Sequence, residues 1–264
     1  MRNYIAFPKL GLEFNINPVA FTLGGITVRW YGIIIALALI IGAFFCTRLA
    51  KKEGLDPDII TDIVLVGAPL GIVCARLYYV FFNWEQYKGD LLSIFAIWNG
   101  GIAIYGAIIG AVLGAYIYLK VKKLNVLKVF DICIFGLLIG QIIGRWGNFV
   151  NTEAYGSITK LPWGMIINNP LSTEMVHPAF LYESLWNLLG FTGLLIYRKH
   201  KKFDGEIFLL YIAWYGIGRC WIEGLRTDSL MFLGTRVSQL VAVLTATVSV
   251  VWWMILRVGT RKQN

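Results

Sequence analysis

No region of this 264-residue sequence is polar over a long enough run to form a separate soluble domain. Hydrophobic residues make up 58% of the chain, and the mean hydropathy is +0.67. A soluble protein of this composition would expose large apolar patches and aggregate. The composition therefore excludes an ordinary soluble protein and indicates a chain that crosses a membrane, where each helical span needs about 20 apolar residues.

The chain also lacks the motifs of common catalytic and cofactor sites. It has no G-x-S-x-G, no H-E-x-x-H, no phosphate-binding loop and no dinucleotide fingerprint. Its four cysteines lie in apolar runs without C-x-x-C or metal-ligand spacing, and we interpret them as small buried side chains: Cys46, Cys74, Cys133 and Cys220. Without a metal, a cofactor or an obvious protein nucleophile, a reaction here would use a nucleophile supplied by a substrate.

Seven apolar segments are long enough to be transmembrane helices. The sequence predicts an all-α integral membrane protein with a single transmembrane domain over residues 1–264 and a long loop near 148–177. In one segment Gly106, Gly110 and Gly114 repeat every four residues, which predicts close helix packing. The predicted spans are Val28–Ala50, Ile59–Phe82, Trp98–Leu119, Val129–Phe149, Ala179–Tyr197, Gly205–Ile222 and Val237–Leu256.

The charge distribution predicts the orientation. The net charge is +9, which in a soluble protein would suggest nucleic acid. In a membrane protein, Lys and Arg are expected in the cytoplasmic connections instead. One set of connections carries 14 Lys and Arg residues and the other set carries 7. The positive-inside rule therefore places the N-terminus outside, the C-terminus in the cytoplasm and the 148–177 loop on the extracytoplasmic side.

Polar residues recur near the same end of several predicted spans. Arg145 and Asn148 are three residues apart and share a helix face, while Tyr215, Arg219 and Glu223 form a stripe at intervals of four. An ionisable residue inside a span is costly and is by default a functional hypothesis. In the predicted orientation these groups lie near the outer face, together with Tyr31, Arg76, Tyr105, Gln141, Glu153, His177, Tyr182 and Glu183.

Several interpretations of these residues are open. Paired Arg and Glu side chains can simply neutralise each other and hold helices together. The excess of arginine instead favours an anionic ligand, because the guanidinium group is a planar fork of donors that suits phosphate. At the outer headgroup level the simplest phosphate is that of a phospholipid. A lipid transporter or flippase would need a polar path into the inner halves of the spans, which are mostly apolar.

The segment GRWGNFVNTEAYG at residues 144–156 closely resembles the signature G-R-x-x-N-F-x-N-x-E-x-x-G of the prolipoprotein diacylglyceryl transferase family. Other segments are similar to that family as well: VRWYG at 28–32, WNGG at 98–101, HPAFLYE at 177–183, and the stripe of Tyr215, Arg219 and Glu223. The resemblance extends from about residue 20 to residue 257.

The resemblance implies a multi-pass enzyme of the bacterial plasma membrane that needs no cofactor. The family transfers the diacylglyceryl group of phosphatidylglycerol to the thiol of the lipobox cysteine in a prelipoprotein signal peptide, and it releases sn-glycerol 1-phosphate. A thioether on the protein cysteine results. The alternatives are another lipid-phosphate transferase that uses the same headgroup site, and the transporter or flippase.

The site residues follow from both the pattern and the resemblance. The predicted catalytic residues are Arg145, Arg219, Tyr105, Glu153 and Glu223. The predicted substrate-binding residues are Arg145, Asn148, Asn151, Gly156, Tyr31, Tyr215 and His177. Many family members have a histidine, the usual candidate for the general base, where this chain has Tyr105. A tyrosine with an ordinary pKa of about 10 is a poor base at neutral pH, so that role does not carry over.

Overall fold

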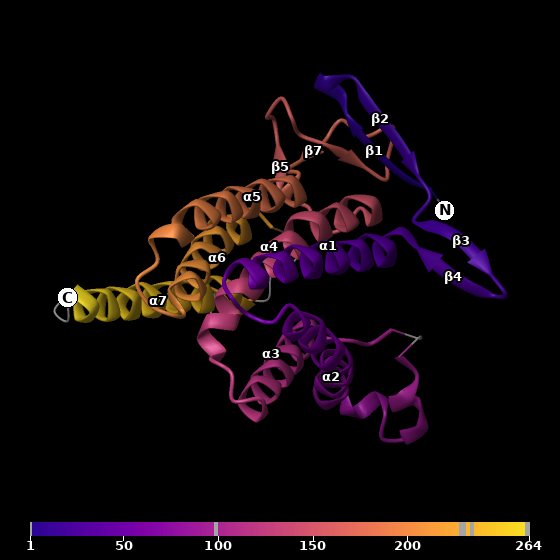
Figure 1. Cartoon of the computed structure of the whole chain (residues 1–264). Coiled ribbons are helices and arrows are strands. Elements are labelled where there is room, and N and C mark those ends of the chain that lie inside the picture. The colour runs from indigo at the N-terminus through magenta and orange to yellow at the C-terminus, as the bar shows by residue number, and fades with distance from the viewer. Residues whose placement is uncertain (1, 98–99, 227–230, 233–234, 262–264) are drawn as a thin grey trace. The chain divides into compact units, whose positions relative to one another are not determined.

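The computed structural model describes residues 2–97, 100–226, 231–232 and 235–261, and these residues are mostly helical (Figure 1). Long helices occupy the seven predicted positions: α1 (Trp30–Lys52), α2 (Asp58–Phe82), α3 (Ile104–Val121), α4 (Val126–Asn151), α5 (Ala179–Tyr197), α6 (Glu206–Leu225) and α7 (Val237–Arg261). All of these except α6 are long and apolar enough to cross a membrane, which makes six. The chain is an all-α integral membrane protein, while the count of seven spans and the orientation of the termini stay predictions.

One predicted boundary is wrong. The third span was expected to begin at Trp98, which lies outside the described residues, whereas α3 begins at Ile104. Gly100 and Gly101 have φ values of +86° and +74°. This left-handed backbone is compatible with glycine and ends any regular helix, so residues 100–103 before α3 are not helical.

Short β-strands accompany the helices and were not predicted. Before α1, β1 (Asn3–Phe7) pairs with β2 (Leu12–Ile16), and β3 (Val19–Leu23) pairs with β4 (Ile26–Arg29). Between α4 and α5 lie β5 (Ile158–Thr159), β6 (Ile166–Ile167) and β7 (Met175–Val176), and before α7 lie β8 (Met231–Phe232) and β9 (Thr235–Arg236). Because β6 pairs with β1, the loop after α4 is tied to the N-terminal strands.

The chain forms two compact units, with the divisions inside α1 and α4. The larger unit is Met1–Phe45 with Cys133–Asn264, and the smaller unit is Cys46–Ile132. The prediction of a single transmembrane domain stays a prediction.

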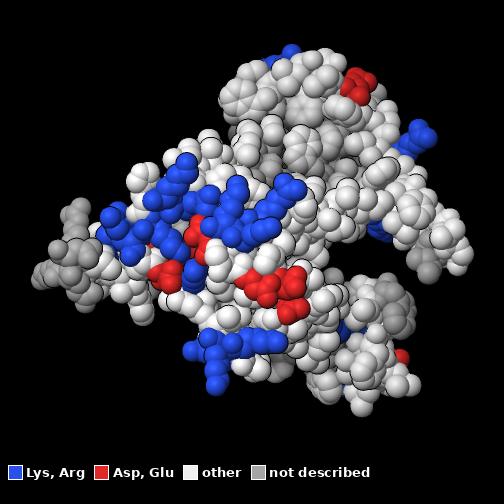
Figure 2. Space-filling view, viewed as in Figure 1, with Lys and Arg blue, Asp and Glu red and all other residues white. Residues whose placement is uncertain are grey.

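In the larger unit, α5, α6 and α7 pack side by side, and α1 approaches α4 closely. A Cβ at Gly42 of α1 would lie 2.9 Å from the carbonyl oxygen of Gly136 of α4, so only glycine permits this approach. A small apolar core beneath the strands contains Ile5, Phe7, Met165 and Phe180. Figure 2 shows Lys and Arg side chains gathered over the part of this unit that holds the α5–α6 connection, where Arg198, Lys199, Lys201 and Lys202 lie.

The smaller unit consists mainly of the α2–α3 pair. A Cβ at Gly106 would lie 2.8 Å from the Cα atom of Ala75, and one at Gly110 would lie 2.5 Å from the carbonyl oxygen of Leu70. The predicted close packing at these glycines is therefore confirmed.

Candidate functional site

The end of α4 places Arg145 and its neighbours in a chain of polar contacts. Arg145 forms an ion pair with Glu183 of α5 and donates a hydrogen bond of 3.4 Å to Oδ1 of Asn148. The Nδ2 atom of Asn148 donates in turn to Oε1 of Glu153 at 2.9 Å, and Asn151 donates to the same oxygen at 3.5 Å. The two amides thus fix the exposed Glu153 carboxylate just beyond the helix.

The α6 stripe meets the same glutamate. Arg219 lies 2.6 Å from Oε2 of Glu223, one turn along α6, and 3.8 Å from Oε1 of Glu183. Arg226, directly after α6, lies 3.6 Å from that Glu183 oxygen. The structure therefore brings together arginines from α4 and from the end of α6 around one α5 carboxylate, a convergence that the sequence analysis predicted for Arg145, Arg219 and Glu223.

Glu183 is the central residue that sequence reasoning left without a role. It was part of the HPAFLYE segment and of the predicted polar group, but nothing in the sequence shows which arginines it meets. Its pairings join residues 38, 36 and 43 positions apart along the chain, so they are tertiary contacts.

The glutamate side chains of this group are more deeply buried than the arginine side chains. The side chains of Glu183 and Glu223 are 6% and 2% exposed, whereas those of Arg145 and Arg219 are 22% and 19% exposed. The carboxylates thus lie behind the arginines and orient them. A guanidinium group has five N–H donors, and one carboxylate does not use them all. Three arginines face two buried carboxylates here, which is an arrangement that can bind an anion at the accessible side.

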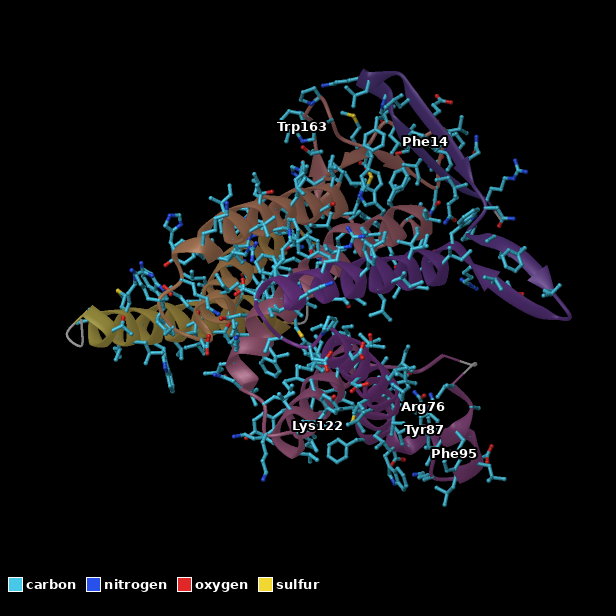
Figure 3. The ribbon with its side chains drawn as sticks, in the orientation of Figure 1. Phe14, Arg76, Tyr87, Phe95, Lys122 and Trp163 are labelled. Carbon is cyan, nitrogen blue, oxygen red and sulfur yellow. The ribbon has the colours of Figure 1, made fainter. Side chains whose placement is uncertain are left out.

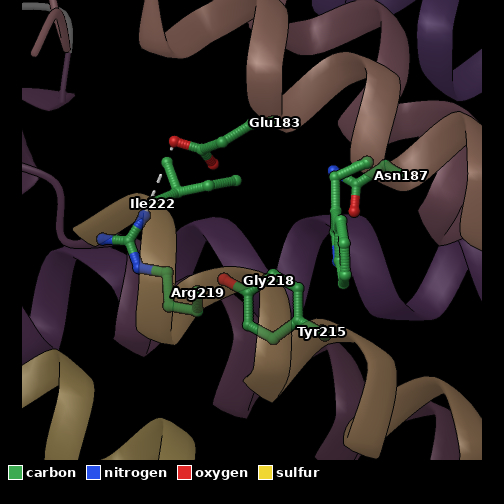
Figure 4. Close-up of a pocket in the computed structure, with 7 residues that line it drawn as sticks. Glu183, Asn187, Tyr215, Gly218, Arg219 and Ile222 are labelled. Atoms are coloured by element: carbon green, nitrogen blue, oxygen red, sulfur yellow. Dashed lines mark ion pairs between the residues drawn. The ribbon is translucent and has the colours of Figure 1, made fainter. Parts of the chain in front are cut away.

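Tyr215 and Tyr31 border this group. A small pocket of about 10 Å³ between α5 and α6 is lined by Tyr215, Arg219 and Glu183. The dashed line in Figure 4 marks the ion pair between Arg219 and Glu183. Tyr31, at the start of α1, lies against Gly147 of α4: a Cβ at Gly147 would be 2.6 Å from the tyrosine ring. Glycine at this position is therefore needed for Tyr31 to lie against α4 two residues after Arg145.

Gly156 and His177 connect the loop to the end of α6. The Gly156 amide donates to the carbonyl oxygen of His177 at 2.9 Å, and Gly156 forms a β-bridge with Arg226. A Cβ at Gly156 would lie 2.7 Å from the Cβ of His177, which explains the small residue. Burial lowers the pKa of His177 below its ordinary value of 6.5, because the charged ring is less well solvated there.

The His177 ring belongs to a short hydrogen-bond chain. Its Nδ1 atom lies 3.1 Å from the Tyr182 hydroxyl, which also accepts a hydrogen bond of 2.7 Å from the indole of Trp163. Because the hydroxyl oxygen accepts a hydrogen bond from Trp163, the hydroxyl can donate its own hydrogen to Nδ1 of His177. In that arrangement the neutral ring carries its proton on Nε2.

Two of the predicted polar residues belong to the smaller unit and are described within it. Tyr105 lies at the start of α3 in the smaller unit, with its ring 6.4 Å from that of Tyr78. Arg76 lies in the same unit and donates four hydrogen bonds of 2.7–2.8 Å to carbonyl oxygens of residues 93–101. Its guanidinium group also lies 5.0 Å from the ring centroid of Tyr87 (Figure 3), so this buried arginine anchors the segment after α2.

Comparison with known proteins finds the same enzyme family in the family model and in the relatives. The model of the prolipoprotein diacylglyceryl transferase family matches residues 18–255. A phosphatidylglycerol–prolipoprotein diacylglyceryl transferase of Clostridioides difficile (strain 630) is 44% identical over 249 residues, which cover 94% of this chain and 97% of the relative. Proteins of the same name from Lysinibacillus sphaericus (strain C3-41) and Streptococcus suis (strain 05ZYH33) are 49% and 47% identical, over 88% and 86% of this chain and 89% and 87% of the relatives.

Proposed function

Since the chain belongs to the prolipoprotein diacylglyceryl transferase family, we propose that it transfers the diacylglyceryl group of phosphatidylglycerol to the lipobox cysteine of bacterial prelipoproteins. The products are a thioether on the prelipoprotein and sn-glycerol 1-phosphate. The observation that carries this proposal is the layered charge of the site: partly exposed arginines lie in front of buried carboxylates that orient them.

Arg145 and Arg219 bind the phosphate of phosphatidylglycerol. Each has a carboxylate behind it and further N–H donors available, so both can contact a phosphodiester without losing their orienting partner. As the phosphate ester breaks, negative charge grows on the departing glycerol phosphate. Donors that are already oriented stabilise that charge without reorganising, which is often the largest catalytic contribution.

The lipobox cysteine, as thiolate, attacks the glyceryl carbon that carries the phosphate ester. The S–C bond forms, the C–O bond breaks, and the electron pair leaves with the phosphate oxygen. Glu153 is our choice for the acceptor of the thiol proton, because its carboxylate is exposed while those of Glu183 and Glu223 are buried against arginines. The substrate is contacted further by Tyr31, Tyr215, Asn151 and the backbone of Gly156. For Tyr105, which belongs to the smaller unit, we propose a role in orienting a substrate.

The predicted orientation places the site at the outer leaflet of the bacterial plasma membrane. The support is the charge asymmetry of the connections, with Lys and Arg concentrated on the side that holds the α5–α6 turn. Cysteine labelling of intact cells tests it: a cysteine introduced at residue 160 should react with an impermeant reagent, and one introduced at residue 201 should not. The reverse labelling would contradict the orientation.

The activity is tested with purified protein, phosphatidylglycerol and a peptide that carries a lipobox cysteine. We expect glycerol phosphate release together with a gain in peptide mass, and loss of both when the peptide cysteine is replaced by serine. Arg145→Ala and Arg219→Ala should each lower kcat by about 10²–10³, the usual cost of one charge-stabilising donor. Arg2→Ala, at an exposed N-terminal arginine, is the matched control.

Two outcomes contradict the proposal. Wild-type turnover in both arginine variants would remove these residues from the site. Glycerol phosphate release that does not depend on the peptide would identify a lipid-phosphate enzyme of another kind.

A further inference from the structure

Trp186 of α5 and Trp214 of α6 form a reciprocal pair. Their rings stack with centroids 4.2 Å apart and an interplanar angle of 14°. The indole nitrogen of Trp186 donates to the carbonyl oxygen of Trp214 at 3.1 Å, and that of Trp214 donates to the carbonyl oxygen of Trp186 at 3.0 Å. The same two residues therefore exchange both hydrogen bonds, each from a side chain to the backbone of the facing helix.

A glycine one turn after each tryptophan makes this exchange possible. In an α-helix the carbonyl oxygen of residue i accepts the amide of residue i+4, and its second lone pair can accept another donor. A Cβ at Gly190 would collide with the indole nitrogen of Trp214, and a Cβ at Gly218 would collide with that of Trp186. The spacing W-x-x-x-G thus occurs in both helices for the same steric reason.

The tryptophan pair lies next to the charged site. Glu183 precedes Trp186 by three residues and so lies on the same face of α5, and Arg219 directly follows Gly218. Trp186 and Gly218 line the pocket that also contains Glu183 and Arg219 (Figure 4). The pair is therefore about one helical turn from the 3.8 Å contact between these two charges.

We propose that Trp186 and Trp214 are positioning residues of the transferase site. They fix the axial register of α5 against α6 and so hold Glu183 at the distance that keeps Arg219 directed at the substrate phosphate. A slide by one residue, about 1.5 Å, would break both indole hydrogen bonds together and would displace Glu183 from Arg219 by a similar amount. A displacement of about 1 Å in a catalytic group can cost a factor of about 10² in rate. This inference rests on the proposed function.

The test uses Trp186→Phe and Trp214→Phe, which keep an aromatic ring and remove the donating N–H group. In purified full-length protein, each variant should lose the far-ultraviolet circular dichroism couplet that the stacked indoles produce by exciton coupling. Each should lower kcat by about tenfold or more, because transition-state contacts depend on alignment, while KM for the lipobox peptide stays within about twofold. The double variant should be no slower than the slower single variant, since the two residues act as a unit.

Glycine variants test the same register without removing an indole. Gly190→Ala places a methyl group against Trp214 and should lower kcat as the Phe variants do, whereas Gly193→Ala in the same helix, with no atom within 4 Å of the new Cβ, should leave it unchanged. If a Phe variant does not fold, the Gly190→Ala and Gly193→Ala pair decides the question.

Other results have distinct meanings. Loss of the couplet with wild-type kcat and KM would overturn the positioning role. A fall in the yield of folded protein with unchanged kcat would also overturn it, since that is the effect of a purely structural pair. If the wild-type protein transfers nothing to the peptide, the proposed function fails. The pair is then judged by a thermal shift with phosphatidylglycerol, and an equal shift in wild type and Trp186→Phe would overturn it.

Discussion

Replacing Glu183 by glutamine removes one negative charge from the centre of three arginines and leaves the side-chain shape unchanged. Glu183 is 6% exposed and contacts Arg145 directly, with Arg219 at 3.8 Å and Arg226 at 3.6 Å. One such contact at about 4 Å is worth about 4 kcal/mol at an effective dielectric constant of about 20. The cost of removing Glu183 from water offsets part of the attraction to the three arginines. We therefore expect the free energy of unfolding to fall by about 3–5 kcal/mol, the loss typical of a broken buried pair.

That loss should lower the Tm in detergent by about 10 °C, since 1 kcal/mol corresponds to about 2–4 °C for a chain of this size. The kcat should fall by about 10², because the arginines lose the group that orients them. Added inorganic phosphate should raise the Tm of Glu183→Gln more than that of the wild type, since an anion can replace the missing charge.

Glu85→Gln is the matched control for this change. It removes a carboxylate from an exposed ion pair with Lys88, whose side chains are 80% and 58% exposed, and such pairs contribute about 0–1 kcal/mol. A Tm within about 2 °C of wild type and an unchanged kcat in Glu183→Gln would refute the assignment of Glu183 as the centre of the site.

Three further changes test other parts of the structure. The pKa of His177 is lower in the folded protein than in the unfolded chain, so as the pH falls the unfolded chain takes up the proton before the folded protein does. The free energy of unfolding should therefore be undiminished by His177 above about pH 6.5 and should decrease below it. Comparison of the Tm at about pH 5.0 and about pH 7.5 measures this, and His177→Gln should show a smaller decrease. Gly147→Ala pushes its methyl group against Tyr31 and should lower activity about tenfold, whereas Gly140→Ala, with open space around the new Cβ, should not; equal activities would remove the Tyr31 contact from the site. Glu206→Gln removes a fully buried carboxylate near the α5–α6 turn and should lower the Tm by several degrees. The kcat of the folded protein should be unchanged, and a lower kcat would show that Glu206 also contributes to catalysis.

The helices could be predicted because a membrane imposes one strong requirement, a continuous apolar run that satisfies its own backbone hydrogen bonds. That requirement locates helices but not their ends. The apolar run before Ile104 contains Gly100 and Gly101, whose positive φ values set the start of α3, and hydropathy does not report φ. The N-terminal strands were missed for a related reason: β1 and β2 have five residues each, which is too short for a reliable alternation of apolar and polar residues.

The sequence predicted that polar residues of several helices gather near one end, but it predicted individual neighbours only within single helices. Spacing showed that Tyr215, Arg219 and Glu223 share a face, and the 2.6 Å ion pair between the last two confirms it. Spacing cannot show which distant residue faces that stripe, so Glu183 was left without a role. Spacing also cannot show that Arg76 donates hydrogen bonds to four carbonyl oxygens of its own unit.

The unequal distances around Arg219 explain how a paired arginine can still bind a ligand. Glu223 holds one guanidinium nitrogen at 2.6 Å, whereas Glu183 lies 3.8 Å from another, beyond hydrogen-bonding range. Within the described residues, Oε1 of Glu183 is buried and accepts no hydrogen bond, a deficit that costs about 1–3 kcal/mol. The looser contact leaves the second nitrogen of Arg219 able to turn toward a phosphate, while the charge of Glu183 still limits how far the arginine moves. Within the described residues, Oε2 of Glu223 is likewise buried without a hydrogen bond, so both carboxylates that face Arg219 have an acceptor oxygen that lacks one.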